Sequence, residues 1–117
     1  MEEECLASRE TCTMALQAVN DALYAVNGKW KLPIMIVLRN GNRRFGQLAK
    51  ELPRITDKML SKELRELEIN QLIKRTVHDT VPAVVEYSLT EYGYSLDSVI
   101  KELKIWGQEH RRRIMSN

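Results

Sequence analysis

A leucine-faced basic helix followed directly by a β-hairpin is the feature that most constrains how this chain folds. In residues 56–68, Leu60, Leu64 and Leu67 recur at i, i+4 and i+7, which is the spacing of one apolar helix face. At 100° per residue, the opposite face carries four polar residues: Lys58, Ser61, Lys62 and Arg65. The helix therefore has one face that must be buried and another that presents three cations to solvent.

The basic face of this helix has two interpretations. Arg and Lys side chains on a helix can meet guanine O6 and N7, or the flanking phosphates, in the major groove of DNA. A soluble amphipathic helix with no nucleic-acid partner shows the same arrangement of residues. The segments before and after the helix therefore have to decide between the two.

The distribution of charge favours the first interpretation. The chain has 117 residues and a formal net charge of only +2, which alone says little about a partner. Between positions 42 and 75, however, nine Lys and Arg accompany five acidic residues, so this segment carries +4 and the rest of the chain −2. The length fits one domain, and 44% hydrophobic with 29% charged residues is ordinary for a globular protein.

Other classes of protein are disfavoured. The longest apolar stretch, residues 32–38, is far shorter than the roughly 20 residues that span a bilayer. Because the N-terminus is acidic and does not fit a secretory leader, we expect a cytoplasmic protein. Cys5 and Cys12 form neither a disulfide framework nor a zinc motif. His78 and His110 lack a catalytic partner at motif spacing, so we expect no enzyme, metal or cofactor.

Three helices are predicted before the basic helix. Residues 1–13 are expected to be flexible, and residues 14–117 to form the domain. Apolar spacings of three and four predict a helix over 14–26, and a second helix over 29–39 is apolar nearly all round, as in the centre of a core. A short third helix from Phe45 ends at Pro53. The short connection to the basic helix makes a helix-turn-helix.

The end of the chain predicts a hairpin and a long helix. Residues 72–77 and 85–89 alternate as strands around a turn at 78–82, with Val85, Tyr87 and Leu89 on one face and Val84, Glu86 and Ser88 on the other. A last helix is predicted from near Thr90.

Because the core is already filled by other elements, the first and last helices carry surplus apolar surface, and we expect them to form a homodimer. The expected interface residues are Leu16, Val19, Leu23, Leu96, Val99, Ile100, Leu103 and Trp106. Burial within one subunit is the alternative.

Four phrases of the sequence resemble one known family. They are Gly28-Lys29-Trp30-Lys31-Leu32, Arg44-Phe45-Gly46-Gln47-Leu48, the run from Leu52-Pro53 to Glu68, and Val85-Glu86-Tyr87-Ser88-Leu89-Thr90 followed by Gly93. In order and spacing they resemble the HxlR-type transcriptional regulators, a branch of the MarR-like winged-helix proteins. The resemblance implies a mainly α fold with a small β-hairpin (α+β), in which a winged helix-turn-helix is joined by N- and C-terminal dimerisation helices.

The resemblance also implies a double-stranded DNA partner and an inverted-repeat operator. We assign Lys58, Ser61, Lys62 and Arg65 to the major groove. Arg43, Arg44 and Arg54 are assigned to phosphates, together with Thr56, the predicted N-cap, where free helix amides favour an anion. The wing would contribute His78 and Thr80, because Val84 stands where many family members carry a cation.

Two other functions remain open from the sequence. Redox-sensing members of the family carry a cysteine where this chain has Gln17, but Cys12, five residues upstream, could sense an oxidant or an electrophile near the dimer interface. An unknown small-molecule effector could act through the same region. Alternatively, the domain could serve as a protein-interaction module with its basic helix merely solvated.

Overall fold

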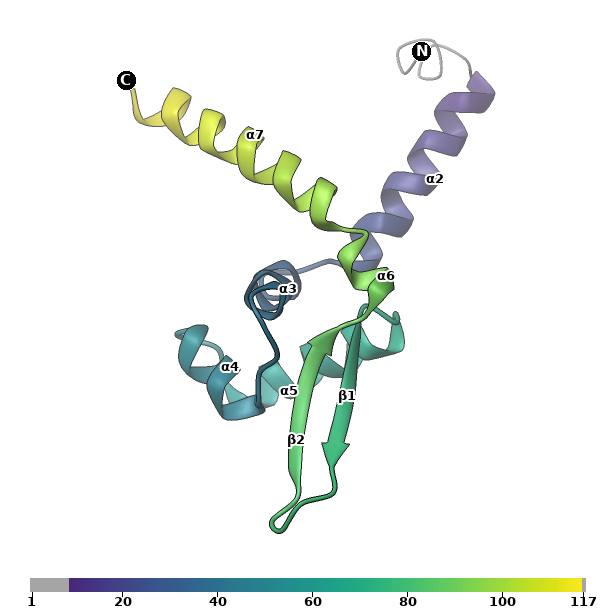
Figure 1. Ribbon diagram of the computed structural model, residues 1–117. Helices are drawn as coiled ribbons and strands as arrows, with labels where there is room; N and C mark the ends of the chain where they lie inside the picture. Colours follow the sequence, from purple (N-terminus) through teal and green to yellow (C-terminus); the bar gives the residue numbers. More distant parts are fainter. Residues whose placement is uncertain (1–8, 117) are drawn as a thin grey trace.

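The computed structural model describes residues 9–116 and has the expected mainly α architecture with one hairpin (Figure 1). In chain order the elements are α2 (Arg9–Ala25), α3 (Lys31–Arg39), α4 (Phe45–Glu51), α5 (Asp57–Ile69), β1 (Ile73–His78), β2 (Val84–Leu89), α6 (Glu91–Tyr94) and α7 (Asp97–Met115). The helix-turn-helix is α4 and α5, and the wing is β1 and β2. The predicted fold class is confirmed.

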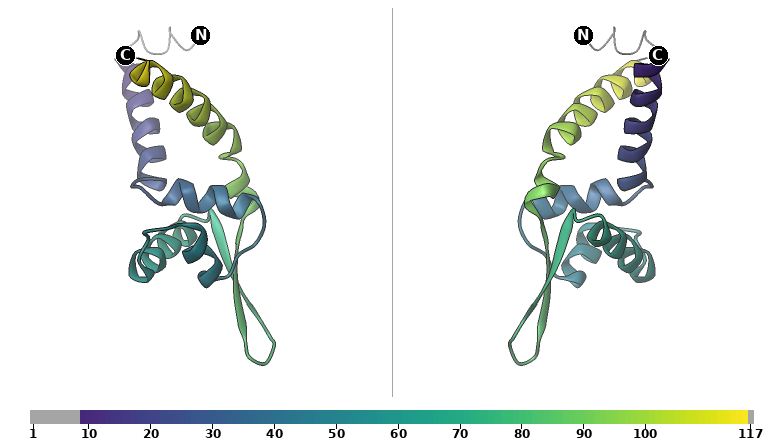
Figure 2. Two further views of the ribbon diagram at one scale, coloured as in Figure 1. Left: turned by 90° about the vertical axis from the view of Figure 1, so that its left-hand side faces the viewer. Right: turned by 90° about the vertical axis from the view of Figure 1, so that its right-hand side faces the viewer.

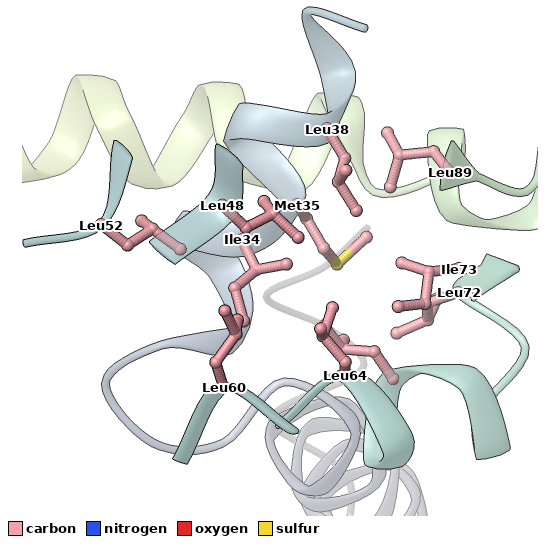
Figure 3. Close-up of a cluster of buried hydrophobic side chains, with 11 residues drawn as sticks. Ile34, Met35, Leu38, Leu48, Leu52, Leu60, Leu64, Leu72, Ile73 and Leu89 are labelled. Carbon is pink, nitrogen blue, oxygen red and sulfur yellow. The ribbon is translucent and has the colours of Figure 1, made fainter. Parts of the chain in front are cut away.

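Helix α3 lies at the centre of the core, as its sequence predicts. Ile34, Met35 and Leu38 are at most 1% exposed and meet the apolar faces of α4, α5 and the hairpin (Figure 3). The remaining buried apolar residues are Leu48, Leu52, Leu60, Leu64, Leu67, Leu72, Ile73 and Leu89. Burying each of these side chains contributes about 1.5–3 kcal/mol to folding, so the leucine face of α5 is fixed against α3.

The turn between α4 and α5 is short and well determined. Arg54 adopts the left-handed region with φ of 79°, and the Ile55 amide donates to the Leu52 carbonyl at 3.2 Å. Thr56 then caps α5, because its Oγ1 accepts a hydrogen bond from the Met59 amide at 3.1 Å. The predicted N-cap is confirmed.

The hairpin is antiparallel, and its register runs from Ile73 opposite Leu89 to His78 opposite Val84. A third segment joins its edge, since the amides and carbonyls of Arg43 and Tyr87 exchange hydrogen bonds of 3.0 and 2.7 Å. Ser88 and Leu89, on opposite faces of β2, are each only 8% exposed, so both faces of the strand are covered where it runs into α6.

The predicted single helix from Thr90 is two helices. Thr90 caps the short α6 by accepting from the Gly93 amide at 2.8 Å, and α7 begins only at Asp97. A Cβ at Gly93 would lie 2.2 Å from the Leu72 carbonyl oxygen. Only glycine at this position therefore allows α6 to approach the start of the hairpin so closely. The chain then turns at Leu96, which packs against the core.

Helices α2 and α7 project away from the core as two arms (Figure 2). Neither contains a buried residue. The radius of gyration is 17.4 Å, against about 13 Å for a compact domain of this length. Helix α2 begins at Arg9 rather than Met14, so the end of the segment expected to be flexible is helical, while residues 1–8, with Cys5, lie outside the described residues.

Candidate nucleic-acid interface

The polar face of α5 forms one exposed surface, which we call the reading face: Lys58, Ser61, Lys62 and Arg65. Together with Thr56 and Met59 these residues line a shallow depression of about 650 Å³. The leucines of the opposite face are at most 2% exposed. The division of α5 into a buried and a cationic face is therefore as the periodicity predicts.

The cations of the reading face have few acidic partners. Among the described residues, Lys58 and Arg65 form no ion pair. Lys62 Nζ lies 3.9 Å from Glu66 Oε2, which is a weak contact between exposed groups. Two cations are thus available to a ligand and the third is held loosely.

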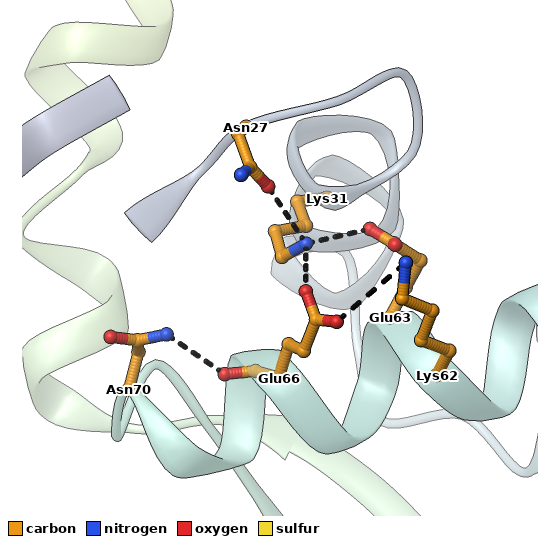
Figure 4. Close-up of polar contacts among 6 residues, drawn as sticks. All are labelled: Asn27, Lys31, Lys62, Glu63, Glu66 and Asn70. Atoms are coloured by element: carbon orange, nitrogen blue, oxygen red, sulfur yellow. Dashed lines mark hydrogen bonds and ion pairs between the residues drawn. The ribbon is translucent and has the colours of Figure 1, made fainter. Parts of the chain in front are cut away.

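Sequence reasoning missed a buried ionic cluster behind the reading face (Figure 4). Lys31, at the first turn of α3, is 2% exposed, and its Nζ donates to Glu66 Oε1 at 2.7 Å, Glu63 Oε2 at 3.0 Å and Asn27 Oδ1 at 3.1 Å. Burial alone would lower the pKa of Lys31, but the hydrogen bonds to Glu66 and Glu63 outweigh it and raise that pKa above 10.5. The Lys31 hydrogen bond lowers the pKa of Glu66 below 4.5.

The three arginines assigned to phosphates differ in their freedom. Arg44 and Arg54 are exposed and form no ion pair among the described residues. Arg43 is bound within the protein: its Nε donates to Glu51 Oε2 at 2.8 Å, and its Nη1 donates to the Gly41 and Asn42 carbonyls at 2.9 and 3.1 Å. Arg43 therefore holds the loop that leads into α4.

The wing residues also form internal contacts. His78 Nε2 lies 3.2 Å from Glu86 Oε1, which also accepts from Asn42 Nδ2 at 3.2 Å, and both contacts lower the pKa of Glu86 below its usual value. Thr80 Oγ1 donates to the Pro82 carbonyl at 2.7 Å. The exposed cations of the wing are instead Lys74 and Arg75 on β1, which the charge count of the segment already included.

The arms carry most of the residues expected at a dimer interface. Leu16, Val19, Leu23, Val99, Leu103 and Trp106 are between 49% and 66% exposed. Leu96 differs, because it packs against the core of its own subunit. Ile100 and Leu103 line a groove of about 580 Å³ between α7 and α3. Cys12 is a half-buried free thiol on α2.

Over residues 9–116, no three His, Cys, Asp or Glu side chains are grouped so that they could hold a metal ion. The helices in that part of the chain are all too short or too polar to cross a bilayer.

The family model for HxlR-like helix-turn-helix proteins matches residues 25–115, which contain α3 to α7 and the reading face. This chain belongs to the HxlR-like helix-turn-helix family. It is therefore a transcriptional regulator of the helix-turn-helix type. The resemblance carried by the four sequence phrases is confirmed over most of the chain.

Relatives of this HxlR-like regulator agree in both sequence and fold. YtcD of Bacillus subtilis, an uncharacterized HTH-type transcriptional regulator, is 42% identical over 97 residues, which are 83% of this chain and 77% of YtcD. Its crystal structure superposes with a TM-score of 0.78 over 80% of this chain and 96% of that one. The redox regulator HypR in its reduced form gives a TM-score of 0.80 at 37% identity, over 86% and 99% of the two chains.

A further relative of the HxlR-like chain is the B. subtilis regulator YodB. It is 36% identical over 90 residues, which are 76% of this chain and 80% of YodB. Structures of YodB have been solved in reduced, diamide-treated and quinone-bound forms. The family thus includes regulators studied in distinct redox and ligand states.

Proposed function

We propose that this chain binds operator DNA as a homodimer and so regulates transcription from nearby promoters. The observation that carries the proposal is the reading face of α5, where three cations and a serine share one exposed surface backed by a fully buried leucine face. A dimer would place two copies of α5 in successive major grooves about 34 Å apart and read an inverted repeat.

The two arms support the dimer. Exposed apolar side chains follow α2 and α7 over most of their length, and no other residue between positions 9 and 116 of the same subunit covers them. Contiguous apolar surface of this kind marks a protein contact in soluble proteins. A two-fold axis between the arms would keep both copies of α5 at a fixed separation.

Residues outside the reading face are proposed to contact the DNA backbone. Arg44 and Arg54 lie on either side of α4 with free guanidinium groups, and the amides at the start of α5 can receive a phosphate next to Thr56. Arg43 is better placed to orient α4 than to bind a phosphate, because its guanidinium is already satisfied. On the wing, Lys74 and Arg75 extend the positive surface more than His78 does.

Two substitutions distinguish base contacts from phosphate contacts. Arg65→Ala is expected to cost about 1–3 kcal/mol on the operator and to relax its sequence preference, since it removes a side chain that reaches base edges. Arg44→Ala is expected to weaken operator and random duplexes alike and to reduce the salt slope by about 0.9. Fluorescence anisotropy across a salt series, with upstream DNA of the gene and a random duplex, measures both. Equal losses on both duplexes for both variants would contradict the assignment.

A second candidate function is redox sensing, favoured by the likeness to HypR and YodB and by the position of Cys12. Its thiol is half-buried on α2, the arm proposed to meet the partner subunit. Mild oxidation is expected to produce a covalent dimer on a non-reducing gel, and Cys12→Ser should abolish that dimer while Cys5→Ser should not. Absence of the band in the wild type would exclude an intersubunit disulfide at this site.

A further inference from the structure

Glu66 connects the buried ionic cluster with the reading face. Its Oε1 accepts a hydrogen bond from Lys31 Nζ at 2.7 Å, and its Oε2 lies 3.9 Å from Lys62 Nζ (Figure 4). The Lys31 side chain is 3% exposed and the Lys62 side chain 68%. One carboxylate thus contacts a buried cation with one oxygen and a cation of the reading face with the other.

The buried cation fixes this carboxylate in place. A lysine ammonium has three donors, and those of Lys31 are directed at Asn27, Glu63 and Glu66. Any movement of Glu66 toward solvent would break the shortest of these bonds and leave a donor of a buried charge unpaired. Glu66 is therefore a fixed acceptor one helical turn beyond Lys62.

Because Glu66 is fixed, even a weak contact with it restricts the positions that the Lys62 ammonium can adopt. An ordinary exposed pair contributes little, because two long side chains lose freedom together. Here Glu66 is already ordered, so only Lys62 loses freedom. A lysine on a flexible stem otherwise reaches phosphates on either side of the groove. Directed toward Glu66, the Lys62 ammonium would instead stay along the axis of α5.

We propose that Glu66 is a positioning residue for sequence selection, which holds Lys62 over the bases and away from the backbone phosphates. The inference rests on the proposed DNA-binding function and adds a determinant of selectivity that does not itself bind DNA. Glu63 supplies the natural comparison, because it contacts Lys31 but no cation of the reading face.

The test compares variants in which one glutamate is replaced by the uncharged glutamine, each measured on two duplexes. One is recovered with the wild-type protein from a random library, and the other is a random duplex of equal length. Glu66→Gln is expected to lower the ratio of selected to random affinity about fivefold or more, and to steepen the salt slope on random duplex by about 0.9, as Lys62 gains a phosphate. Glu63→Gln and Glu68→Gln each remove one negative charge from the same helix and are expected to leave the ratio within about twofold.

A double-mutant cycle identifies the route of the effect. In a Lys62→Ala background, Glu66→Gln is expected to leave the ratio unchanged, because the carboxylate has no cation to position. A fall in the ratio that persists without Lys62, or an equal fall for Glu68→Gln, would overturn the inference. Thermal melting separates it from a purely structural role, since Glu63→Gln should lose at least as much stability as Glu66→Gln. Failure of the wild type to enrich any sequence would overturn the DNA-binding proposal itself, and this inference with it.

Discussion

Lys31→Met is expected to lower the free energy of unfolding by about 3–5 kcal/mol, because it leaves the buried carboxylate of Glu63 without a cation. Methionine has an unbranched side chain only one heavy atom shorter than that of lysine, so the loss reflects charge far more than a cavity. The Glu63 side chain is only 10% exposed, so water cannot replace the lost cation fully. Urea denaturation followed by circular dichroism measures the loss.

Two variants make the Lys31 result interpretable. Arg112→Met breaks the exposed pair of Arg112 with Glu109 on α7 and is expected to cost less than about 1 kcal/mol. The double variant Lys31→Met/Glu63→Leu is expected to recover most of the lost stability, because an apolar pair replaces the buried ions. A loss for Lys31→Met no larger than that for Arg112→Met would contradict the structural role of the cluster.

The contribution of the cluster has a defined dependence on pH. The folded pKa of Lys31 is raised, so its stabilisation is complete below 10.5 and is lost as the pH rises through the folded pKa. The folded pKa of Glu66 is lowered, so its stabilisation is complete above 4.5 and is lost as the pH falls through the folded pKa. The stability difference between wild type and Lys31→Met should therefore be constant between these limits and shrink beyond both.

Leu103→Glu is expected to convert the proposed dimer into a monomer and to weaken operator binding by about a thousandfold, since only one α5 would then engage. Leu103 is 51% exposed in one subunit, so the subunit itself should fold with a charge at this position. In the dimer the same carboxylate would be buried without a partner. Analytical ultracentrifugation and anisotropy on the selected duplex measure the two effects.

Gln108→Glu is the matched control for Leu103→Glu. It adds the same charge to α7, at an exposed position about 140° around the helix from Leu103, and is expected to leave both mass and affinity unchanged. A wild-type protein that sediments as a monomer at micromolar concentration, or a Leu103→Glu variant that remains dimeric, would contradict an interface through this face of α7.

Much of the fold could be predicted from the periodic segments of the sequence. The leucines of α5 and the apolar run of α3 predicted which faces are buried, and Thr56 and Pro53 predicted where the basic helix starts. These features depend on neighbours within one or two helical turns, where spacing and capping chemistry are decisive. The same reasoning placed the cations of the reading face together.

The features that sequence reasoning missed are pairings between distant segments. Lys31 and Glu63 are 32 residues apart, and each looks like an ordinary charge at the edge of an apolar face. The close approach of Gly93 in α6 to the Leu72 carbonyl also joins distant segments, and no local pattern encodes it. Similarly, the contacts of Arg43 with Glu51 and of His78 with Glu86 became visible only once the loops and the wing were folded.

The exchange of hydrogen bonds between Arg43 and Tyr87 has a consequence for changes in chain length. This single bridge fixes the loop between α3 and α4 against β2. One residue inserted between Gly41 and Arg43 would either break this bridge or bring a neighbouring residue opposite Tyr87, with its side chain on the other face. The fold is therefore expected to tolerate insertions better at the exposed wing tip around Val81, which lies beyond the last strand pair, His78 with Val84.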